Sequence, residues 1–310
     1  MQVIKIGTRG SKLALYQANK TKEILKKAFP GLSVEICIIQ TKGDKILDVA
    51  LSKIGDKGLF TKEIENALLN GSVDLAVHSL KDLPTTLPHG LELGAVLERG
   101  EFRDALVSHK GLQWNDLKPG HAVATSSLRR QAALLHQHPG ITIKDIRGNV
   151  ETRIRKMEEG YCDAMIMAAA GLQRLDLAKY ISEILEPDTI MPAVSQGAIA
   201  IEIRENDAEV KSLIDKINHP STSTAVKAER AFLRTLEGGC QVPLGSYSKI
   251  EGEEITLHGF VASTNGETFL TEKISGSTSN PEACGIALAQ KLIDMGAKAI
   301  LEQIRLNMQH

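Results

Sequence analysis

Seven basic side chains follow predicted strands in the first 180 residues, an arrangement that suits an anion site. They are Arg9, Lys81, Arg129, Arg130, Arg147, Arg153 and Arg174. Unpaired cations gathered at one edge of a sheet repel each other, so we expect an anion to lie among them. Arginine binds carboxylates and phosphates through paired N–H groups. No glycine-rich nucleotide motif occurs, and the expected ligand therefore carries several carboxylates rather than phosphates.

Hydroxyl and amide side chains accompany these cations, at Ser11, Ser79, Thr125, Ser126, Ser127 and Asn149. Such residues cap helices, and for each one alone a capping role is favoured over a ligand contact. Residues two apart on a helix point in different directions, so Arg153 and Arg155 cannot both face the site. We expect Arg153 to point inward.

Two further residues have reactive side chains in unusual settings. Asp82 stands among the cations and before Pro84, where it either forms an ion pair or turn cap, or stays ionised and stabilises a developing positive charge. Cys240 follows Gly238 and Gly239, which either end a helix or leave space around a nucleophilic thiol.

The remaining cysteines are expected to be packed, reduced and inert, because Cys37, Cys162 and Cys284 lie in apolar patterns. The four cysteines show no metal-ligand spacing, and no metal site is expected. A glycine-flanked basic stretch near Lys53 and Lys57 is either a plain surface turn or a mobile lid.

Charge is segregated although the formal net charge is only −1. Residues 1–62 hold 12 lysines and arginines against 5 acids, and residues 121–180 hold 9 against 6, so two basic regions are available to one anion site. No secretory leader is recognisable after Met1. The apolar stretch 164–172 is about half of the roughly 18 residues that span a membrane, and we expect a soluble, cytosolic protein.

Short apolar runs alternate with amphipathic segments, which predicts an α/β fold of parallel strands joined by helices. Strands are predicted at 2–6, 33–39, 73–77, 93–97, 121–124, 141–146, 162–167 and 198–203. After about residue 220 the pattern changes to a helix at 221–236, alternating runs at 243–250, 254–262 and 267–275, and one long helix at 281–306, which predicts a small α+β domain with an antiparallel sheet. Segments 98–103 and 191–197 are interpreted as a paired hinge.

Several motifs together resemble the porphobilinogen deaminase family over nearly the whole chain. They are Thr8-Arg9-Gly10-Ser11, Gly58-Leu59-Phe60-Thr61, His78-Ser79-Leu80-Lys81-Asp82, Thr125-Ser126-Ser127-Leu128-Arg129-Arg130, Arg147-Gly148-Asn149-Val150, Gln196-Gly197-Ala198 and Glu237-Gly238-Gly239-Cys240. The resemblance implies two hinged α/β domains like those of type II periplasmic binding proteins, and a C-terminal domain that carries a cofactor cysteine. The implied domains are 1–98 with 198–217, 99–197, and 218–310.

The resemblance also implies the chemistry. Four porphobilinogen molecules would be joined head to tail on a dipyrromethane primer held by a thioether to Cys240, with loss of ammonia and release of hydroxymethylbilane. Asp82 would be the catalytic carboxylate. Primer contacts are implied for Lys81, Asp82, Thr125, Ser126, Ser127, Arg129, Arg130, Arg147 and Gly148. Substrate contacts are implied for Arg9, Ser11, Lys53, Lys57, Phe60, Ser79, Arg147, Asn149, Arg153, Arg174 and Gln196.

The same resemblance implies a cytoplasmic monomer that binds neither nucleic acid nor membrane and passes its product to uroporphyrinogen-III synthase. Two other classes remain open from the residues alone. A non-catalytic two-domain binding protein for a small acid would share the hinge and the basic cleft without needing Asp82 or Cys240. A nucleic-acid binder is disfavoured, because aromatic residues are only 4% and no stacking pattern accompanies the arginines.

Overall fold

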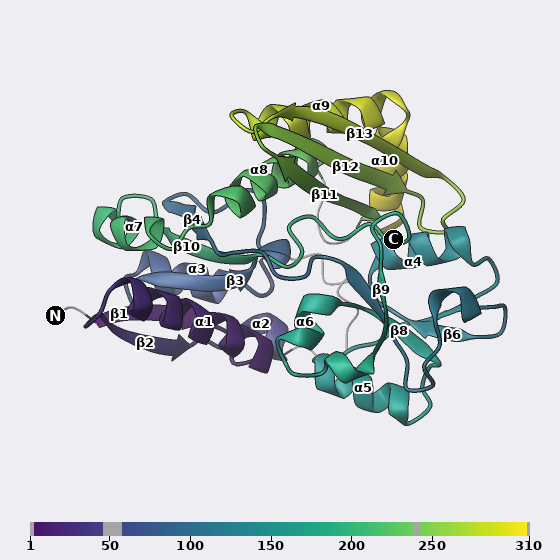
Figure 1. Ribbon diagram of the computed structural model, residues 1–310, viewed down its shortest axis with the longest axis horizontal. Coiled ribbons are helices and arrows are strands. Elements are labelled where there is room, and N and C mark those ends of the chain that lie inside the picture. The colour runs from purple at the N-terminus through teal and green to yellow at the C-terminus, as the bar shows by residue number, and fades with distance from the viewer. Residues whose placement is uncertain (1–2, 46–57, 238–241, 309–310) are drawn as a thin grey trace. The chain divides into compact units, whose positions relative to one another are not determined.

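The computed structural model describes residues 3–45, 58–237 and 242–308, which form two compact units (Figure 1). The first unit contains the described residues up to 45, residues 58–100 and residues 197–223. The second contains residues 101–196 and the described residues from 224 onward. No helix in these described ranges is long and apolar enough to cross a membrane.

The first unit is built on one five-stranded sheet with the order β2-β1-β3-β10-β4. Its elements are β1 (Val3–Thr8), α1 (Lys12–Ala28), β2 (Ser33–Ile38), α2 (Lys42–Lys45), α3 (Lys62–Leu69), β3 (Leu75–Ser79), the 3₁₀ turn η2 (Leu80–Asp82), β4 (Leu91–Val96), β10 (Ile199–Arg204) and α7 (Ala208–Asp215). Strand β1 pairs in parallel with β2 and β3, so the residues that follow these strands come out at one edge of the sheet. Arg9 and Asp82 are thereby placed at the same edge.

The second unit contains a sheet of the same size with the order β7-β6-β8-β5-β9. Its elements are β5 (Asp104–Val107), the turn η3 (Trp114–Asp116), β6 (Ala122–Ala124), α4 (Leu128–Gln137), β7 (Thr142–Lys144), α5 (Val150–Glu158), β8 (Ala164–Ala168), α6 (Ala169–Gln173), the turn η4 (Ala178–Tyr180) and β9 (Ile181–Leu185). Strand β6 pairs in parallel with β7 and β8, which places the loops after these three strands at one edge.

The two sheets have the same strand arrangement. Three neighbouring strands run parallel, the fourth runs antiparallel to them, and the fifth forms the edge of the sheet beside the fourth. The antiparallel strand is β10 in the first unit and β5 in the second. Each of them directly follows a segment in which the chain passes between units, so no helix precedes it to enforce a parallel direction. The predicted parallel strands are therefore found as three neighbouring strands of each sheet, and one further strand of each sheet runs antiparallel to them. Strands β5 and β9 were not predicted at all.

The unit boundaries fall inside the two segments interpreted as a hinge, after Gly100 and before Gly197. The backbone N–H of Gly100 donates to the carbonyl of Gly197 at 3.1 Å, so the two segments are joined where they meet. The proposed division into domains 1–98 with 198–217, 99–197 and 218–310 stays a prediction, as does any hinge motion.

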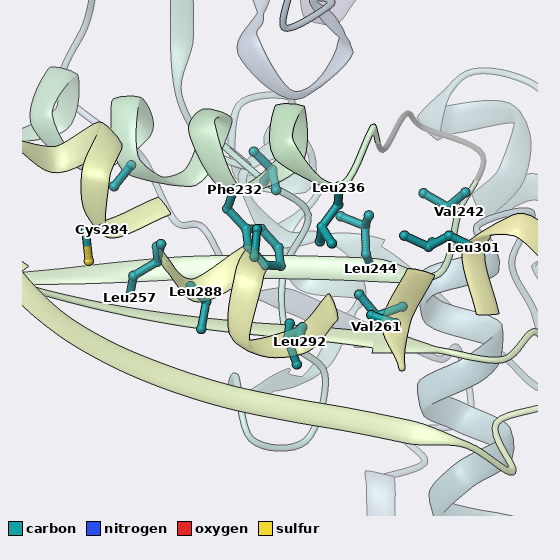
Figure 2. Packing of buried hydrophobic residues seen from close by; sticks show 14 of the residues in the cluster. Phe232, Leu236, Val242, Leu244, Leu257, Val261, Cys284, Leu288, Leu292 and Leu301 are labelled. Carbon is teal, nitrogen blue, oxygen red and sulfur yellow. The ribbon is translucent and has the colours of Figure 1, made fainter. Parts of the chain in front are cut away.

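The C-terminal part of the second unit is a three-stranded antiparallel sheet covered by helices (Figure 2). It contains β11 (Leu244–Glu251), β12 (Glu254–Ala262), β13 (Phe269–Ser277), α9 (Pro281–Asp294) and α10 (Ala297–Met308); α8 (Pro220–Thr235) leads into it from the first unit. Phe232, Leu257 and Leu288 are fully buried in its core. Burying side chains of this kind stabilises a fold by about 1.5–3 kcal/mol each, which explains why the alternating strands face the helices.

The predicted single helix at 281–306 is wrong, because Gly296 has φ of +105° and separates α9 from α10. Glycine adopts this left-handed conformation without the steric cost that a Cβ brings, and such residues end helices. The predicted fold class is confirmed: two α/β sheets of mixed strand direction, followed by a small α+β part with an antiparallel sheet.

Candidate active site

Asp82 lies in η2 at the end of the buried strand β3. Leu80 and Leu83 on either side of it are buried, and the N–H of Leu80 donates to the carbonyl of Ala198 at 3.0 Å, which fixes the turn. The Asp82 side chain is exposed and has no ion pair and no hydrogen bond to any residue that the structure describes. It is therefore neither the cap nor the ion pair that the sequence left open, and its carboxylate is available to a ligand.

The two hydroxyl residues predicted near this edge of the first unit each have a local partner. Ser11 caps α1 by accepting a hydrogen bond from the N–H of Ala14 at 3.3 Å. Ser79 Oγ accepts one from Gln17 Nε2 at 2.8 Å. Ser11 thus has the capping role favoured from sequence, whereas Ser79 is half-buried beside Lys81 and held by a buried glutamine.

Arg9 is not an unpaired cation, because its guanidinium binds Asp44. Nε and Nη2 of Arg9 donate to Asp44 Oδ1 at 3.1 and 2.5 Å, and the guanidinium lies 4.2 Å from the centre of the Phe60 ring. Burial raises the pKa of Asp44, but hydrogen bonds from Arg9 and Thr41 outweigh it and hold the pKa below its usual value. Arg9 is therefore held in one place by a carboxylate and an aromatic ring.

Arg129 and Arg130 are also paired, and both contact the buried carboxylate of Asp104. Nη2 and Nε of Arg130 donate to its two oxygens at 2.8 and 3.1 Å, and Arg129 Nη1 lies 2.8 Å from Oδ2. The expectation that these cations are unpaired is wrong, because a carboxylate far away in the sequence neutralises part of their charge. One carboxylate serves two guanidiniums, however, so a net positive charge remains.

The loop between β7 and α5 carries Arg147, Gly148, Asn149 and Arg153. Asn149 caps α5 by accepting a hydrogen bond from the N–H of Thr152 at 2.9 Å, the role favoured from sequence. Gly148 has φ of +114°, and a Cβ there would lie 2.7 Å from a Thr152 methyl carbon, so the loop requires glycine. Arg147 lies 4.0 Å from Asp145.

Arg153 points inward, as predicted, and donates from Nε to the carbonyl of Gly148 at 2.8 Å. Burial, followed by repulsion from Arg130 and Arg147, lowers the pKa of Arg153 to about 10. Among the described residues no carboxylate lies within ion-pair distance of it. Arg155 instead faces solvent and lies 3.8 Å from Glu159 on its own helix. A guanidinium held in this way favours an anion as its partner.

The loop between β6 and α4 supplies the three predicted hydroxyls. Ser126 Oγ donates to the carbonyl of Ile146 at 2.6 Å and so joins this loop to the one carrying Arg147. Thr125 is buried, and its Oγ1 accepts from the N–H of Ser127 at 3.2 Å. Ser127 precedes α4 without a side-chain cap, so its hydroxyl is open to a ligand at the helix N-terminus. Arg174 is half-buried after α6.

Gln196, implied as a substrate contact, is fully buried in this structure. Its Nε2 donates to the carbonyl of Phe102 and to Asp104 Oδ1, both at 2.8 Å. Its contact with substrate stays a prediction. Three other predicted residues, Lys53, Lys57 and Cys240, lie outside the described residues.

The seven predicted cations thus divide between two sheets instead of sharing one edge. Arg9 and Lys81 belong to the first unit, and Arg129, Arg130, Arg147, Arg153 and Arg174 belong to the second. The sequence also missed Asp44 and Asp104. Each had a weak signal: Asp44 is an acid inside a basic segment, and Asp104 begins a short apolar run directly after the first hinge segment.

Fold and site together define a two-unit α/β protein with an exposed acid on one unit and a partly neutralised arginine cluster on the other. Two family models match the chain: "Porphobilinogen deaminase, dipyromethane cofactor binding domain" at residues 4–212, and "Porphobilinogen deaminase, C-terminal domain" at residues 223–294. The chain belongs to the porphobilinogen deaminase family, and the resemblance inferred from its motifs is confirmed.

Curated relatives named porphobilinogen deaminase match over nearly full length. The Moorella thermoacetica protein is 51% identical over 302 residues, covering 97% of this chain and 96% of the relative. The Nostoc sp. protein is 49% identical over 306 residues, covering 98% and 95%.

Solved structures that resemble the chain are more distant. The periplasmic VFT2 domain of Bordetella pertussis BvgS has a TM-score of 0.41 at 15% identity, covering 69% of this chain and 86% of that one. The probable amino-acid ABC transporter extracellular-binding protein ytmK from Bacillus subtilis also has a TM-score of 0.41, at 14% identity, covering 70% and 90%.

Proposed function

We propose that this chain is an active porphobilinogen deaminase, a transferase that joins four porphobilinogen molecules on a primer and releases hydroxymethylbilane. The single observation that carries the proposal is the exposed carboxylate of Asp82, which forms no ion pair or hydrogen bond with the described residues, in a chain of this family. A protein that only bound a small acid would gain nothing from an acid at that position, since it would repel the ligand.

The residues of the second unit fit a primer that carries several carboxylates. Asp104 neutralises only part of the charge on Arg129 and Arg130, and Arg153 has no carboxylate partner among the described residues. The dipyrromethane would supply a free pyrrole α-carbon to which each new unit is joined. We propose that Cys240 anchors it through a thioether, and that Arg129, Arg130, Arg147 and the backbone near Gly148 hold its acetate and propionate groups.

The remaining predicted residues divide by unit. We propose that Ser127 and Arg174 bind the growing chain in the second unit. Arg9, Phe60, Ser79 and Lys81 would bind porphobilinogen in the first. Asp82 would stabilise positive charge that develops on pyrrole nitrogen as ammonia leaves, and would accept or return a proton at that nitrogen. We also propose a cytoplasmic monomer whose product passes to uroporphyrinogen-III synthase.

The decisive experiment measures the intact mass of the denatured protein and its reaction with Ehrlich's reagent, which detects pyrroles. The expected result is a mass excess equal to two pyrrole units, together with ammonia and hydroxymethylbilane formation from porphobilinogen. A bare polypeptide mass in protein made with abundant porphobilinogen, and binding of porphobilinogen without ammonia release, would point to a binding protein instead.

Replacing Arg153 with methionine is expected to weaken substrate binding and to stabilise the ligand-free protein. The change removes a buried cation that Arg130 and Arg147 repel, so the melting temperature of primer-free protein should rise by roughly 2–4 °C, on the order of 1 kcal/mol. The KM for porphobilinogen should rise about tenfold because a charge-assisted contact is lost. Thermal unfolding and steady-state kinetics measure both effects.

Arg155→Met is the matched control, since Arg155 lies on the same helix but faces solvent. It should change the unfolding free energy by less than about 0.5 kcal/mol and leave KM unaltered. A lower melting temperature for Arg153→Met than for the parent would show that Arg153 stabilises the empty site.

A further inference from the structure

Asp104, the first residue of β5, has a carboxylate whose oxygens are both occupied by side-chain donors. Oδ1 accepts from Arg130 Nη2 and Gln196 Nε2, both at 2.8 Å. Oδ2 accepts from Arg130 Nε at 3.1 Å and contacts Arg129 Nη1 at 2.8 Å. The residue is fully buried. Asp104 therefore cannot touch a ligand, and any role in the reaction acts through its partners.

The geometry at Arg130 shows what this carboxylate achieves. A guanidinium has five N–H groups. Asp104 takes two of them, on the Nε side, and the carbonyl of Ile166 takes a third from Nη1 at 3.1 Å. The other two, one on each terminal nitrogen, have no partner among the described residues. These two N–H groups can donate to a carboxylate, and the side chain is 9% exposed.

The charge balance around Asp104 supports the same conclusion. The carboxylate stays ionised, because the two arginines outweigh the effect of burial and hold the pKa of Asp104 far below its usual value. One negative charge for two guanidiniums keeps the cluster stable when empty and leaves positive charge for an anionic ligand. Without Asp104, two adjacent buried cations would repel each other and lose their fixed orientation.

Asp104 is also connected to both segments that pass between the units. Gln196 joins it to the carbonyl of Phe102, and Arg129 Nη1 donates to the carbonyl of Met191 at 2.5 Å. Through these hydrogen bonds, Arg129 and Arg130 are joined to both segments in which the chain passes between the units. One segment begins at residue 101, and the other ends at residue 196.

We propose that Asp104 is a positioning residue for primer and chain binding: it holds Arg130, and with it Arg129, in the orientation in which their remaining N–H groups meet ligand carboxylates. The inference rests on the proposed function, which supplies the ligand. It assigns to Asp104 a role in affinity and none in the bond-forming step, since the Asp104 side chain is fully buried and acts through the two arginines.

The test is Asp104→Asn in the full-length protein, purified after expression and again after incubation with porphobilinogen. The fraction of molecules with the two-pyrrole mass should fall about tenfold, and in the loaded fraction KM for porphobilinogen should rise about tenfold while kcat stays within roughly threefold. A residue that only supported the fold would lower stability without this separation of KM from kcat.

Glu229→Gln is the matched control. Glu229 is an equally buried carboxylate of the same unit, and it holds the same crossing by accepting from the N–H of Ser195 at 2.7 Å and from that of Ser248 at 3.1 Å. It should lower the melting temperature as Asp104→Asn does, while primer loading and KM stay within about twofold of wild type.

Two results would overturn the proposal: Asp104→Asn with wild-type loading and KM, or Glu229→Gln with the same loss of loading. If Asp104→Asn does not fold, Gln196→Leu replaces it, because it removes one donor to Asp104 and keeps the ion pairs. Its expected effect is about a threefold rise in KM, and an unchanged KM overturns the proposal. A wild-type protein without the primer mass overturns the proposed function as well, so the two failures are distinguishable.

Discussion

Replacing Cys240 with alanine is expected to yield a folded protein that carries no pyrrole mass and forms no hydroxymethylbilane. A thioether needs a thiolate nucleophile, and alanine offers none. Without an anchored primer the first bond has no acceptor, so product formation should fall by on the order of 10³-fold or more. Intact mass of the denatured protein and a product assay measure the two effects. The prediction tests the family motif, because Cys240 lies outside the described residues.

Cys37→Ser is the control for this experiment. Cys162 and Cys284 are buried, and burial raises the pKa of all three remaining thiols, that of Cys162 to about 11. Thiols held protonated are poor nucleophiles, and none of the three should carry the primer. Cys37 is only partly buried, so serine there should leave loading and activity intact. Full activity with a primer mass in Cys240→Ala would contradict the anchor assignment.

Replacing Asp82 with asparagine is expected to lower kcat by about 10²- to 10⁴-fold, the range for loss of a general acid–base group. Asparagine has nearly the same shape but cannot balance positive charge or exchange a proton with pyrrole nitrogen. Because Asp82 is exposed and forms no hydrogen bond or ion pair with the described residues, the melting temperature should stay within about 1–2 °C of wild type. Steady-state kinetics and thermal unfolding measure both quantities.

Asp215→Asn serves as the control, since Asp215 is an exposed aspartate at the end of α7 on the same unit. It should leave kcat and KM unchanged. Asp82→Asn should still carry the primer only if loading the primer needs fewer catalytic cycles than a full turnover. The mass of the denatured variant shows directly whether the primer is present. A kcat for Asp82→Asn within threefold of wild type would remove Asp82 from the mechanism.

Local sequence patterns predicted the elements that carry the site. The strand ends before Arg9, Asp82, Thr125 and Arg147 lie where alternating apolar runs stop, and the caps at Ser11 and Asn149 follow from residue type alone. These features depend on neighbours a few residues away, and a linear pattern contains that information. Local patterns did not show that β5 and β10 run antiparallel to their neighbours, because the direction of these strands depends on the path of the chain between the two units.

Longer-range pairings were invisible in the sequence. Asp44 binds Arg9 from 35 positions away, Asp104 binds Arg130 from 26 positions away, and Gln196 reaches Asp104 across 92. The motif Gln196-Gly197-Ala198 implied a ligand contact for Gln196, and the fold buries its amide among protein groups. Residue type showed that these groups are polar, and only the fold determined what they contact.

The sequence by itself determined most of the strands and helices, the family, and the kinds of side chain at the strand ends, because these depend on local propensity and recognisable motifs. The tertiary structure decided which cations have a positive charge that no carboxylate of the described residues balances. Arg9 is paired, Arg129 and Arg130 share one carboxylate, and Arg153 has none among the described residues. The reason is physical: electrostatic interaction depends on distance and burial in space, and neither quantity is a function of separation along the chain.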